Sequence, residues 1–374
     1  MMDKKIFLSS PTMHAEEQLY IKEAFDTNWI APLGANVDNF ENEMANYIGV
    51  KHAAALVSGT SAIHLAVKLA GVKENDIVFC SDLTFAATVN PVSYEHAKQV
   101  FIDSEYNTWN MSPEALEKAF IKYPQCKVVI MVHLYGIPAK IDEIKEICDK
   151  NGAVLIEDAA ESLSAKYKGK QTGSFGKYGI LSFNGNKIIT TSGGGMLLSD
   201  DENAIKKARF WSTQSRDPAP HYQHSEIGYN YRMSNVVAGI GRGQLLHLDE
   251  HKEAKKAIYE KYKAELINFP IKMNPYEKCS EPNFWLSCMT IETGNVTPEQ
   301  IRLELEKSNI ECRPIWKPMH LQPVFAGCDY VNVNNRDVGR DIFARGLCLP
   351  SDIKMTEDEQ MKVIGIIKSC MRNI

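Results

Sequence analysis

The sequence lacks long hydrophobic runs. The longest unbroken apolar stretch in a strand-like segment covers residues 128–132, far short of the roughly 18 residues that a membrane-spanning helix needs. The first ten residues, MMDKKIFLSS, hold an apolar core of only three residues, so we expect no signal peptide. These features predict a cytoplasmic protein with no membrane partner.

A strong net charge is also missing. Forty-two Lys and Arg residues stand against 47 Asp and Glu, which leaves −5 at pH 7. Because no basic field is available, we expect no nucleic-acid partner, and any anionic ligand has to be held by local groups. The composition, 44% hydrophobic and 24% charged over 374 residues, is that of a folded globular protein with about two to three domains.

Cysteine and histidine patterns typical of metal sites are absent. None of the nine cysteines forms a Cys-x-x-Cys pair, so we expect reduced, buried thiols rather than disulfides or a zinc site. His64, His96 and His133 have no second histidine or carboxylate at ligand spacing. We therefore predict no bound metal.

The order of apolar and amphipathic segments predicts an α/β fold. Between residues 50 and 200, short apolar runs alternate with amphipathic stretches such as 112–122 and 140–150, a pattern typical of a mostly parallel sheet between helices. Seven strands are expected, at 53–57, 77–80, 99–102, 127–132, 153–156, 179–183 and 196–199.

The last third of the sequence changes in character. Residues 234–266 predict one long helix, and a smaller α+β unit follows it. Its expected elements are strands at 285–291 and 310–315 and helices at 297–307 and 356–370. We therefore predict a large domain over 1–245, and a linking helix with a small C-terminal domain over 246–374.

Polar clusters follow several of the predicted strands, where open α/β sheets hold their ligands. The first, Ser58-Gly59-Thr60-Ser61-Ala62, joins a strand to a helix, and its small residues suit a phosphate at the helix N-terminus. An ordinary helix cap is the alternative. The second, Glu157-Asp158-Ala159-Ala160-Glu161, follows an apolar strand. A partly desolvated carboxylate there needs a pyridinium nitrogen, a lysine or a main-chain N–H, and helix capping is the alternative.

The third cluster contains a lysine in uncharged surroundings. Lys187 is the one charged residue between positions 178 and 198, and glycines follow at 193–195. A desolvated lysine can act as a nucleophile and form a Schiff base, whereas a solvent-facing lysine is the commoner alternative. The fourth cluster, residues 228–234, interleaves two tyrosines with Asn230 and Arg232, and aromatic packing is its alternative explanation.

Taken in order, these clusters resemble the DegT/DnrJ/EryC1/StrS sugar aminotransferases, which are fold-type I enzymes that use pyridoxal 5′-phosphate. The resemblance runs from Asn28 to His320 and so covers nearly the whole chain. It implies that Lys187 forms a Schiff base with the cofactor and that Asp158 pairs with its pyridine nitrogen. The other implied cofactor contacts are Gly59, Thr60, Ser61 and Ser182 at the phosphate, Phe85 on the ring face, Glu161 near the ring hydroxyl or the substrate, and Asn230 from a neighbouring subunit.

The lysine motif, Phe183 to Gly195, is most similar to that of exopolysaccharide and UDP-N-acetylbacillosamine aminotransferases, with Asn184 where most of the family has His. The implied reaction moves an amino group from L-glutamate to carbon 4 of UDP-2-acetamido-2,6-dideoxy-hexos-4-ulose. The resemblance also implies a homodimer with shared active sites. The implied sugar-nucleotide contacts are Asn28, Trp29, Ile30, Ala31, Lys317 and His320.

Two alternatives stay open at this point. The first is an aminotransferase for another nucleotide keto sugar, linked to GDP or dTDP or aminated at carbon 3, because cofactor motifs do not read the nucleotide. The second is a non-catalytic regulatory protein on the same fold, which the presence of Lys187 disfavours.

Overall fold

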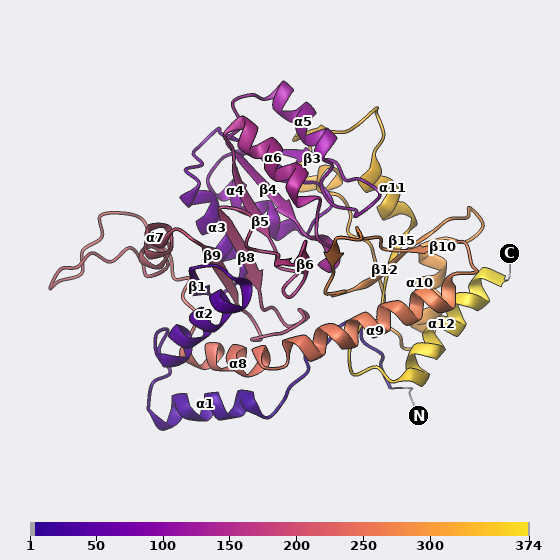
Figure 1. Cartoon of the computed structure of the whole chain (residues 1–374), viewed down its shortest axis with the longest axis horizontal. Helices are drawn as coiled ribbons and strands as arrows, with labels where there is room; N and C mark the ends of the chain where they lie inside the picture. The colour runs from indigo at the N-terminus through magenta and orange to yellow at the C-terminus, as the bar shows by residue number, and fades with distance from the viewer. Residues whose placement is uncertain (1–3, 373–374) are drawn as a thin grey trace.

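The computed structural model describes residues 4–372, and an eight-stranded sheet forms its larger part (Figure 1). The strand order is β1-β9-β8-β5-β4-β2-β3-β14. Only the pairings of β9 with β1 and β8 are antiparallel. The strands are β1 (His52–Leu56), β2 (Ile77–Ser81), β3 (Lys98–Ile102), β4 (Val128–Val132), β5 (Val154–Asp158), β8 (Tyr178–Ser182), β9 (Gly195–Ser199) and β14 (Asp329–Val331).

This sheet confirms the predicted α/β class and contains all seven predicted strands. The additional strand, β14, comes from the C-terminal third of the chain and pairs in parallel with β3. With only three residues, β14 is too short for its own pattern to mark it as a strand.

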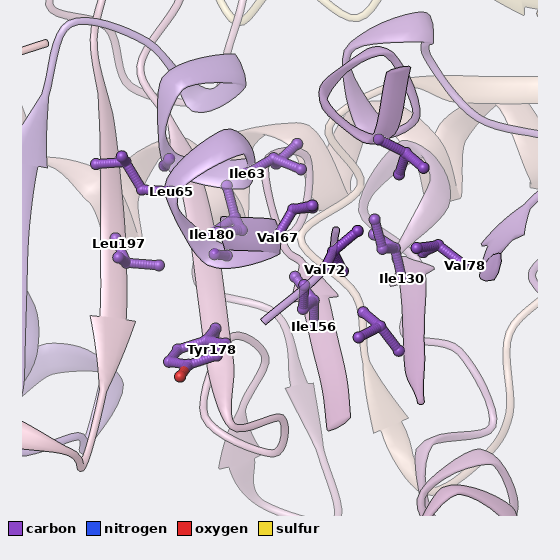
Figure 2. Packing of buried hydrophobic residues seen from close by; sticks show 14 of the residues in the cluster. Ile63, Leu65, Val67, Val72, Val78, Ile130, Ile156, Tyr178, Ile180 and Leu197 are labelled. Carbon is purple, nitrogen blue, oxygen red and sulfur yellow. The ribbon is translucent and has the colours of Figure 1, made fainter. Parts of the chain in front are cut away.

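Helices cover both faces of the sheet, as side-chain alternation along a buried strand requires. Val78 and Cys80 of β2 pack in the cluster that α3 closes, whereas Phe79 between them packs in the cluster closed by α5 and α6. Figure 2 shows the first cluster, with Ile63 and Val67 of α3 packed beside Ile130, Ile156 and Ile180 of the strands. The helices of this part are α1 (Glu16–Asp26), α2 (Ala35–Ile48), α3 (Gly59–Leu69), α4 (Asn90–Tyr94), α5 (Pro113–Lys122), α6 (Ile141–Asn151) and α7 (Glu202–Ser212).

Two predicted helices are confirmed together with the reasons for them. The Ser112 hydroxyl caps α5 by accepting a hydrogen bond of 3.2 Å from the main-chain N–H of Ala115, and Pro113 occupies the first turn. In α6 the buried side chains are Ile141, Ile144, Ile147 and Cys148, the stripe that the sequence spacing predicts.

The prediction of one continuous helix over 234–266 is wrong. The structure has two helices, α8 (Asn235–Leu245) and α9 (Leu248–Leu266), that meet at a bend around His247 (Figure 1). The His247 ring lies 3.1 Å from carboxylate oxygens of both Glu16 and Glu250 and stacks on His14 at 3.6 Å. No glycine or proline marks the bend, because contacts with the N-terminal segment hold it.

A second, antiparallel sheet lies beyond α9, with the order β10-β12-β15-β13. Its core joins residues of α9, α10 and α12 with Ile6 from the N-terminal segment. The strand predicted at 310–315 shortens to two residues. The elements are β10 (Ile271–Met273), β12 (Ser287–Ile291), β13 (Arg313–Pro314), β15 (Gly346–Leu349), α10 (Pro298–Lys307), α11 (Val338–Arg345) and α12 (Glu357–Arg372), with a small third sheet of β6 (Lys166–Tyr167), β7 (Lys170–Gln171) and β11 (Ser280–Glu281).

The domain boundary between residues 245 and 246 stays a prediction. Ile6 packs in the core of the smaller part and β14 extends the larger sheet, so the chain crosses between the two parts more than once. Among residues 4–372, none of the helices is long and apolar enough to cross a membrane.

Candidate active site

A pocket of about 310 Å³ opens where β5 and β8 end and α3 begins. Trp285 and Trp316, from the C-terminal third of the chain, form part of its wall. The predicted site residues that line it are Gly59, Thr60, Phe85, Asp158, Glu161, Ser182 and Lys187. Segments that follow four strands of the large sheet, β1, β2, β5 and β8, therefore meet at one cavity, as the sheet topology requires.

Lys187 lies in the turn that follows β8, and its main-chain N–H donates a hydrogen bond of 3.0 Å to the carbonyl of Asn184. Its Nζ atom lies 4.0 Å from the centroid of the Trp285 ring. Burial lowers the pKa of this amine, while the charges of Glu161 and Asp158 oppose the shift. The side chain of Lys187 is half-buried, and a lowered pKa favours the neutral amine that a nucleophile needs. The role of Lys187 as the nucleophile stays a prediction.

Asp158 ends β5 inside the pocket and is only 3% exposed. The Thr88 hydroxyl donates to Oδ2 at 2.7 Å, and the main-chain N–H of Ala160 donates to Oδ1 at 3.1 Å. Burial raises the pKa of the Asp158 carboxyl, and the Thr88 hydrogen bond offsets part of this shift. A carboxylate held by two neutral donors can still gain from a cationic partner such as a pyridinium nitrogen.

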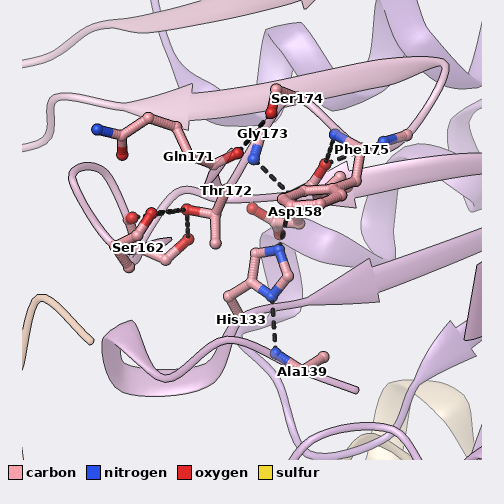
Figure 3. Close-up of polar contacts among 12 residues, drawn as sticks. His133, Ala139, Asp158, Ser162, Gln171, Thr172, Gly173, Ser174 and Phe175 are labelled. Carbon is pink, nitrogen blue, oxygen red and sulfur yellow. Dashed lines mark hydrogen bonds and ion pairs between the residues drawn. The ribbon is translucent and has the colours of Figure 1, made fainter. Parts of the chain in front are cut away.

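The neighbouring carboxylate, Glu157, has a structural role instead. Its oxygens accept hydrogen bonds from His133 Nε2 at 2.8 Å and from the main-chain N–H groups of Phe175 and Gly176 at 2.8 and 3.0 Å. Figure 3 shows His133 and the turn at Gly173 and Phe175 converging on this point, with Ala139 on the other ring nitrogen of His133. Burial opposes ionisation of Glu157, but these hydrogen bonds outweigh it and lower the pKa.

The three carboxylates of the second predicted cluster therefore differ in role, and each of the alternatives that the sequence left open applies to some of them. Main-chain N–H groups satisfy Glu157, whereas Asp158 and Glu161 line the pocket. Oε2 of Glu161 accepts a hydrogen bond of 2.6 Å from the main-chain N–H of Tyr135. Burial raises the pKa of Glu161, and the charge of Lys187 opposes that shift.

The end of the pocket at the N-terminus of α3 is rich in hydrogen-bond donors. The Ser58 hydroxyl caps α3 by accepting from the N–H of Ser61 at 3.0 Å. Ser61 itself is buried against this cap and does not line the pocket. Within residues 4–372, the N–H groups of Gly59 and Thr60 and the hydroxyl of Ser182 make no hydrogen bond, so they are available to an anion at the helix N-terminus.

The glycine run after Lys187 has a steric cause. A Cβ atom on Gly195 would lie 2.2 Å from the main-chain carbon of Ser58 and 2.3 Å from the nitrogen of Gly59. Only a glycine lets β9 pass this close to the turn that opens α3. Gly195 therefore shapes the donor-rich end of the pocket from outside it.

The other predicted site residues lie outside the pocket of this chain. Asn230 is exposed and forms a β-bridge with Thr213, and the segment between these two residues projects beyond α7 (Figure 1). Residues 28–31 lie between α1 and α2, where Asn235 binds the carbonyls of Trp29 and Ala31 at 2.8 and 3.0 Å. Lys317 is exposed.

His320 is engaged within the protein, since its ring nitrogens lie 2.8 Å from Asp82 and 3.1 Å from Asp337. These two contacts account for both nitrogens of the ring. The structure does not bring His320 to the pocket lining.

Several pocket residues were not predicted as site residues, and two of them, Thr88 and Trp285, contact predicted ones. Thr88 follows Phe85 by three positions, and its contact with Asp158 joins the turn after β2 to the end of β5. Trp285 lies nearly one hundred residues after Lys187, and no local pattern distinguishes it from a core tryptophan.

The residues present fit a phosphorylated pyridine aldehyde. A desolvated amine, a buried carboxylate and a cradle of neutral donors meet in one cavity, as the class of pyridoxal-phosphate enzymes requires. A model of the DegT/DnrJ/EryC1/StrS aminotransferase family matches residues 11–368. The chain belongs to this family and is a pyridoxal-phosphate-dependent sugar aminotransferase, so the non-catalytic alternative is not retained.

Individual relatives agree with this assignment. Over 372 residues the chain is 54% identical to the pyridoxal phosphate-dependent aminotransferase EpsN of Bacillus subtilis, covering 98% of this chain and 96% of EpsN. It is 35% identical to a GDP-perosamine synthase of Caulobacter vibrioides over 97% of each chain. It is 37% identical to the UDP-4-amino-4,6-dideoxy-N-acetyl-β-L-altrosamine transaminase of Campylobacter jejuni, over 66% of this chain and 67% of that one.

Solved structures show the same fold. A DegT DnrJ EryC1 StrS aminotransferase from Brucella abortus has a TM-score of 0.88 at 26% identity over 95% of each chain. The sugar aminotransferase Spr1654 of Streptococcus pneumoniae, in its PLP form, has a TM-score of 0.91 at 23% identity over 99% of each chain.

Proposed function

We propose that the enzyme transfers an amino group from L-glutamate to carbon 4 of UDP-2-acetamido-2,6-dideoxy-hexos-4-ulose, toward UDP-N-acetylbacillosamine and glycan or exopolysaccharide synthesis in the cytoplasm. The observation that carries the chemistry is the meeting of Lys187, Asp158 and Glu161 in one pocket. The identity of 54% to the aminotransferase EpsN supports the reaction class, and the match to a UDP-sugar transaminase supports the substrate class.

Pyridoxal phosphate, when bound, supplies an electron sink for the carbon that bears the amino group. Lys187 would bind it covalently, and its released amine would move the proton at that carbon in both half-reactions. Asp158 would hold a proton on the ring nitrogen, since burial and the absence of a full ion pair leave this carboxylate in need of a cationic partner. Glu161 would lie beside the amine and oppose the loss of its charge.

Neutral donors would hold the cofactor phosphate. Gly59, Thr60 and Ser182 present N–H and hydroxyl groups at the N-terminus of α3, where an anion is favoured without a basic side chain. The exposed Phe85 would cover one face of the ring. This arrangement accommodates an anionic ligand in a protein whose net charge is −5.

We also propose a homodimer in which each active site is completed by the partner chain. Asn230 is exposed and forms a β-bridge with Thr213, and the segment between these two residues, which projects beyond α7 (Figure 1), carries the exposed side chains of Tyr222 and Ile227. Since its own pocket does not contain Asn230, this amide would reach the phosphate of a neighbouring subunit. In the same assembly, residues 28–31 and 316–320 would contact the nucleotide sugar.

A second candidate is amination of a GDP-linked keto sugar. GDP-perosamine synthases of Caulobacter vibrioides and Escherichia coli are 35% and 33% identical to the chain over 95% or more of its length. They share the fold and the cofactor chemistry, so the pocket described above does not separate the two nucleotides. The pocket likewise does not distinguish a dTDP-linked sugar, or amination at carbon 3, from the proposed reaction.

A direct substrate comparison tests the proposal. The holoenzyme would be incubated with L-glutamate and, separately, with UDP-, GDP- and dTDP-linked 4-keto-6-deoxy sugars, and the products identified by mass spectrometry and NMR. We expect amination of the UDP-linked acetamido sugar at carbon 4, with a kcat/KM at least about tenfold above the others. Amination of the GDP-linked sugar alone would replace the proposal with the second candidate.

A further inference from the structure

The amine of Lys187 rests on an aromatic face. Its Nζ atom lies 4.0 Å from the centroid of the Trp285 ring, well inside the range of a cation–π contact. Within the described residues 4–372, this Nζ atom makes no hydrogen bond or ion pair. The indole face is therefore the direct partner of the reacting nitrogen in this structure.

Trp285 is buried, makes two hydrogen bonds as a donor and comes from the C-terminal third of the chain. It precedes β12 and is 2% exposed. Its indole N–H donates a hydrogen bond of 2.7 Å to the carbonyl of Asn186, the residue just before Lys187. Its main-chain N–H donates to Oδ1 of Asn283 at 2.9 Å. One side chain thus touches both the amine of Lys187 and the turn that carries it.

A second lysine, which the proposed chemistry does not use, anchors this arrangement. Lys255 of α9 is 3% exposed, and its ammonium donates to the carbonyls of Trp285 and Ser351 at 3.1 and 2.9 Å and to the hydroxyl of Ser9 at 3.4 Å. The Ser9 hydroxyl in turn donates to the carbonyl of Asn186 at 3.0 Å. The two residues that donate to that carbonyl, Trp285 and Ser9, therefore each accept a hydrogen bond from Lys255.

The buried ammonium of Lys255 needs hydrogen-bond partners to be stable in the protein interior. Removing an ammonium from water is costly unless each of its donors is paired, and here three acceptors from separate segments meet the three N–H groups of Lys255. Lys255 thereby ties the N-terminal segment and the smaller part of the molecule to the turn of Lys187.

We propose that the face of Trp285 receives the amino group of Lys187 whenever that amine is not bonded to the cofactor, and that Lys255 is a positioning residue which holds Trp285 and the Lys187 turn in register. The proposal holds for any keto sugar, and it rests on the proposed covalent role of Lys187. It explains how a released lysine stays at the reacting carbon instead of turning toward solvent. An amine with a fixed resting place needs little reorganisation to move a proton.

The test uses the full-length enzyme in its pyridoxamine phosphate form, in which Lys187 is free. Lys187 would be labelled with acetic anhydride across a pH series and quantified by peptide mass spectrometry. In Trp285→Met, which keeps an apolar side chain but loses the aromatic face, the labelling midpoint moves to lower pH by about half a pH unit or more, because the ammonium loses its cation–π partner. In Trp285→Phe the ring face remains, so the midpoint stays near that of the wild type.

Hydrogen exchange of the peptide over residues 184–189 provides the second readout. Trp285→Phe removes the N–H donor to Asn186, so exchange accelerates in this variant even if Trp285→Met does not fold. Lys255→Met gives the same acceleration, whereas Lys252→Met does not, since the Lys252 ammonium binds the carbonyl of Ser164 instead.

Trp211→Phe is the matched control, because its indole N–H also binds an acceptor, Glu226 at 2.7 Å, away from the pocket. An unchanged midpoint in Trp285→Met, or exchange in Lys255→Met equal to that in Lys252→Met, would overturn the proposal. Neither readout uses a sugar. A failure of the substrate proposal therefore leaves both readouts unaffected. If Lys187 were labelled equally in the pyridoxal and pyridoxamine forms of the enzyme, the covalent role of Lys187 would be overturned.

Discussion

The main-chain N–H of Tyr135 donates a hydrogen bond of 2.6 Å to Oε2 of Glu161. Tyr135 has a φ of 53°, in the left-handed region that a bulky residue rarely adopts. Its hydroxyl accepts from the main-chain N–H of Trp316 at 3.0 Å. Tyr135 thus links a pocket carboxylate to a pocket tryptophan, and its unusual backbone conformation persists because both contacts hold it.

Replacing Glu161 with Gln should stabilise the protein at alkaline pH. Burial raises the pKa of Glu161 above its usual 4.5, so the folded state binds a proton more tightly than the unfolded state does. Wild-type stability then falls as pH rises from about 4.5 through the raised folded pKa, and a neutral Gln avoids this loss. We expect a gain of ~1 kcal/mol in the free energy of unfolding at pH 8 and little gain at pH 5, measured by urea titration.

Replacing Glu157, the other glutamate of this cluster, should give the opposite result. His133 and main-chain N–H groups hold the pKa of Glu157 below its usual value, so its stabilising contribution is present above about pH 4.5 and is lost as pH falls through the lowered folded pKa. Glu157→Gln should therefore cost ~2 kcal/mol at pH 8. A gain in stability for Glu157→Gln, or a loss for Glu161→Gln, would show that the assignment of the two carboxylates is reversed.

Replacing Asp158 with Asn should leave the cofactor bound but slow the reaction. The neutral amide cannot hold a proton on the pyridine nitrogen, so we expect kcat to fall by a factor of about 100 or more, equivalent to ~3 kcal/mol. Stopped-flow absorbance of the half-reaction with L-glutamate would measure this. Thr88→Val, which removes only the hydroxyl donor to Oδ2, should cause a smaller decrease. A wild-type rate in Asp158→Asn would contradict the role given to this carboxylate.

Replacing Gly195 with Ala should weaken cofactor binding. The added Cβ would meet the main chain at Ser58 and Gly59 within 2.3 Å, so the turn that opens α3 has to move. We expect the Kd for pyridoxal phosphate to rise by about tenfold or more, ~1.4 kcal/mol, in a spectrophotometric titration. Gly185→Ala is the control, since its Cβ would meet only a carbonyl at 3.8 Å, and equal effects of the two substitutions would contradict the steric account.

Mixing two inactive variants should restore activity if the active sites are shared. In the proposed dimer, each site takes Lys187 from one chain and Asn230 from the partner chain, so Lys187→Ala and Asn230→Asp each remove one of the two. In a mixed dimer, both substitutions fall on one site and leave the other intact. We therefore expect up to about one quarter of wild-type activity after subunits are exchanged at equal amounts, a statistical limit for a closed dimer. No recovery in a sample shown by native mass spectrometry to contain mixed dimers would contradict the proposal for Asn230.

Local sequence patterns predicted the parts of the fold that local interactions determine. The apolar runs gave the strands of the large sheet, and the Ser112-Pro113 pair marked the start of α5. The strand β14 was not predictable, because its three residues become a strand only by pairing with β3, more than 200 residues earlier. The bend at His247 was not predictable either, since its cause is contact with Glu16 and His14.

The site shows the same division. Lys187 and Asp158 stand out because their charge is unusual in the apolar sequence around them, and both line the pocket. Trp285 gives no such signal, since a tryptophan before a strand is typical of a hydrophobic core. Only the packing of the smaller part against the sheet brings Trp285 to Lys187. Asn230 and residues 28–31 were predicted by resemblance, and one chain alone does not bring them to the pocket.

The formation of 2-oxoglutarate in a single turnover tests the central claim most directly. Wild-type enzyme and Lys187→Ala, each loaded with pyridoxal phosphate, would be mixed with L-glutamate without any sugar, and the keto acid and the cofactor absorbance followed together. We predict one equivalent of 2-oxoglutarate per wild-type site and none from Lys187→Ala, which should also lack the visible absorbance of the covalently held cofactor. Formation of 2-oxoglutarate by Lys187→Ala at the wild-type rate would contradict the account.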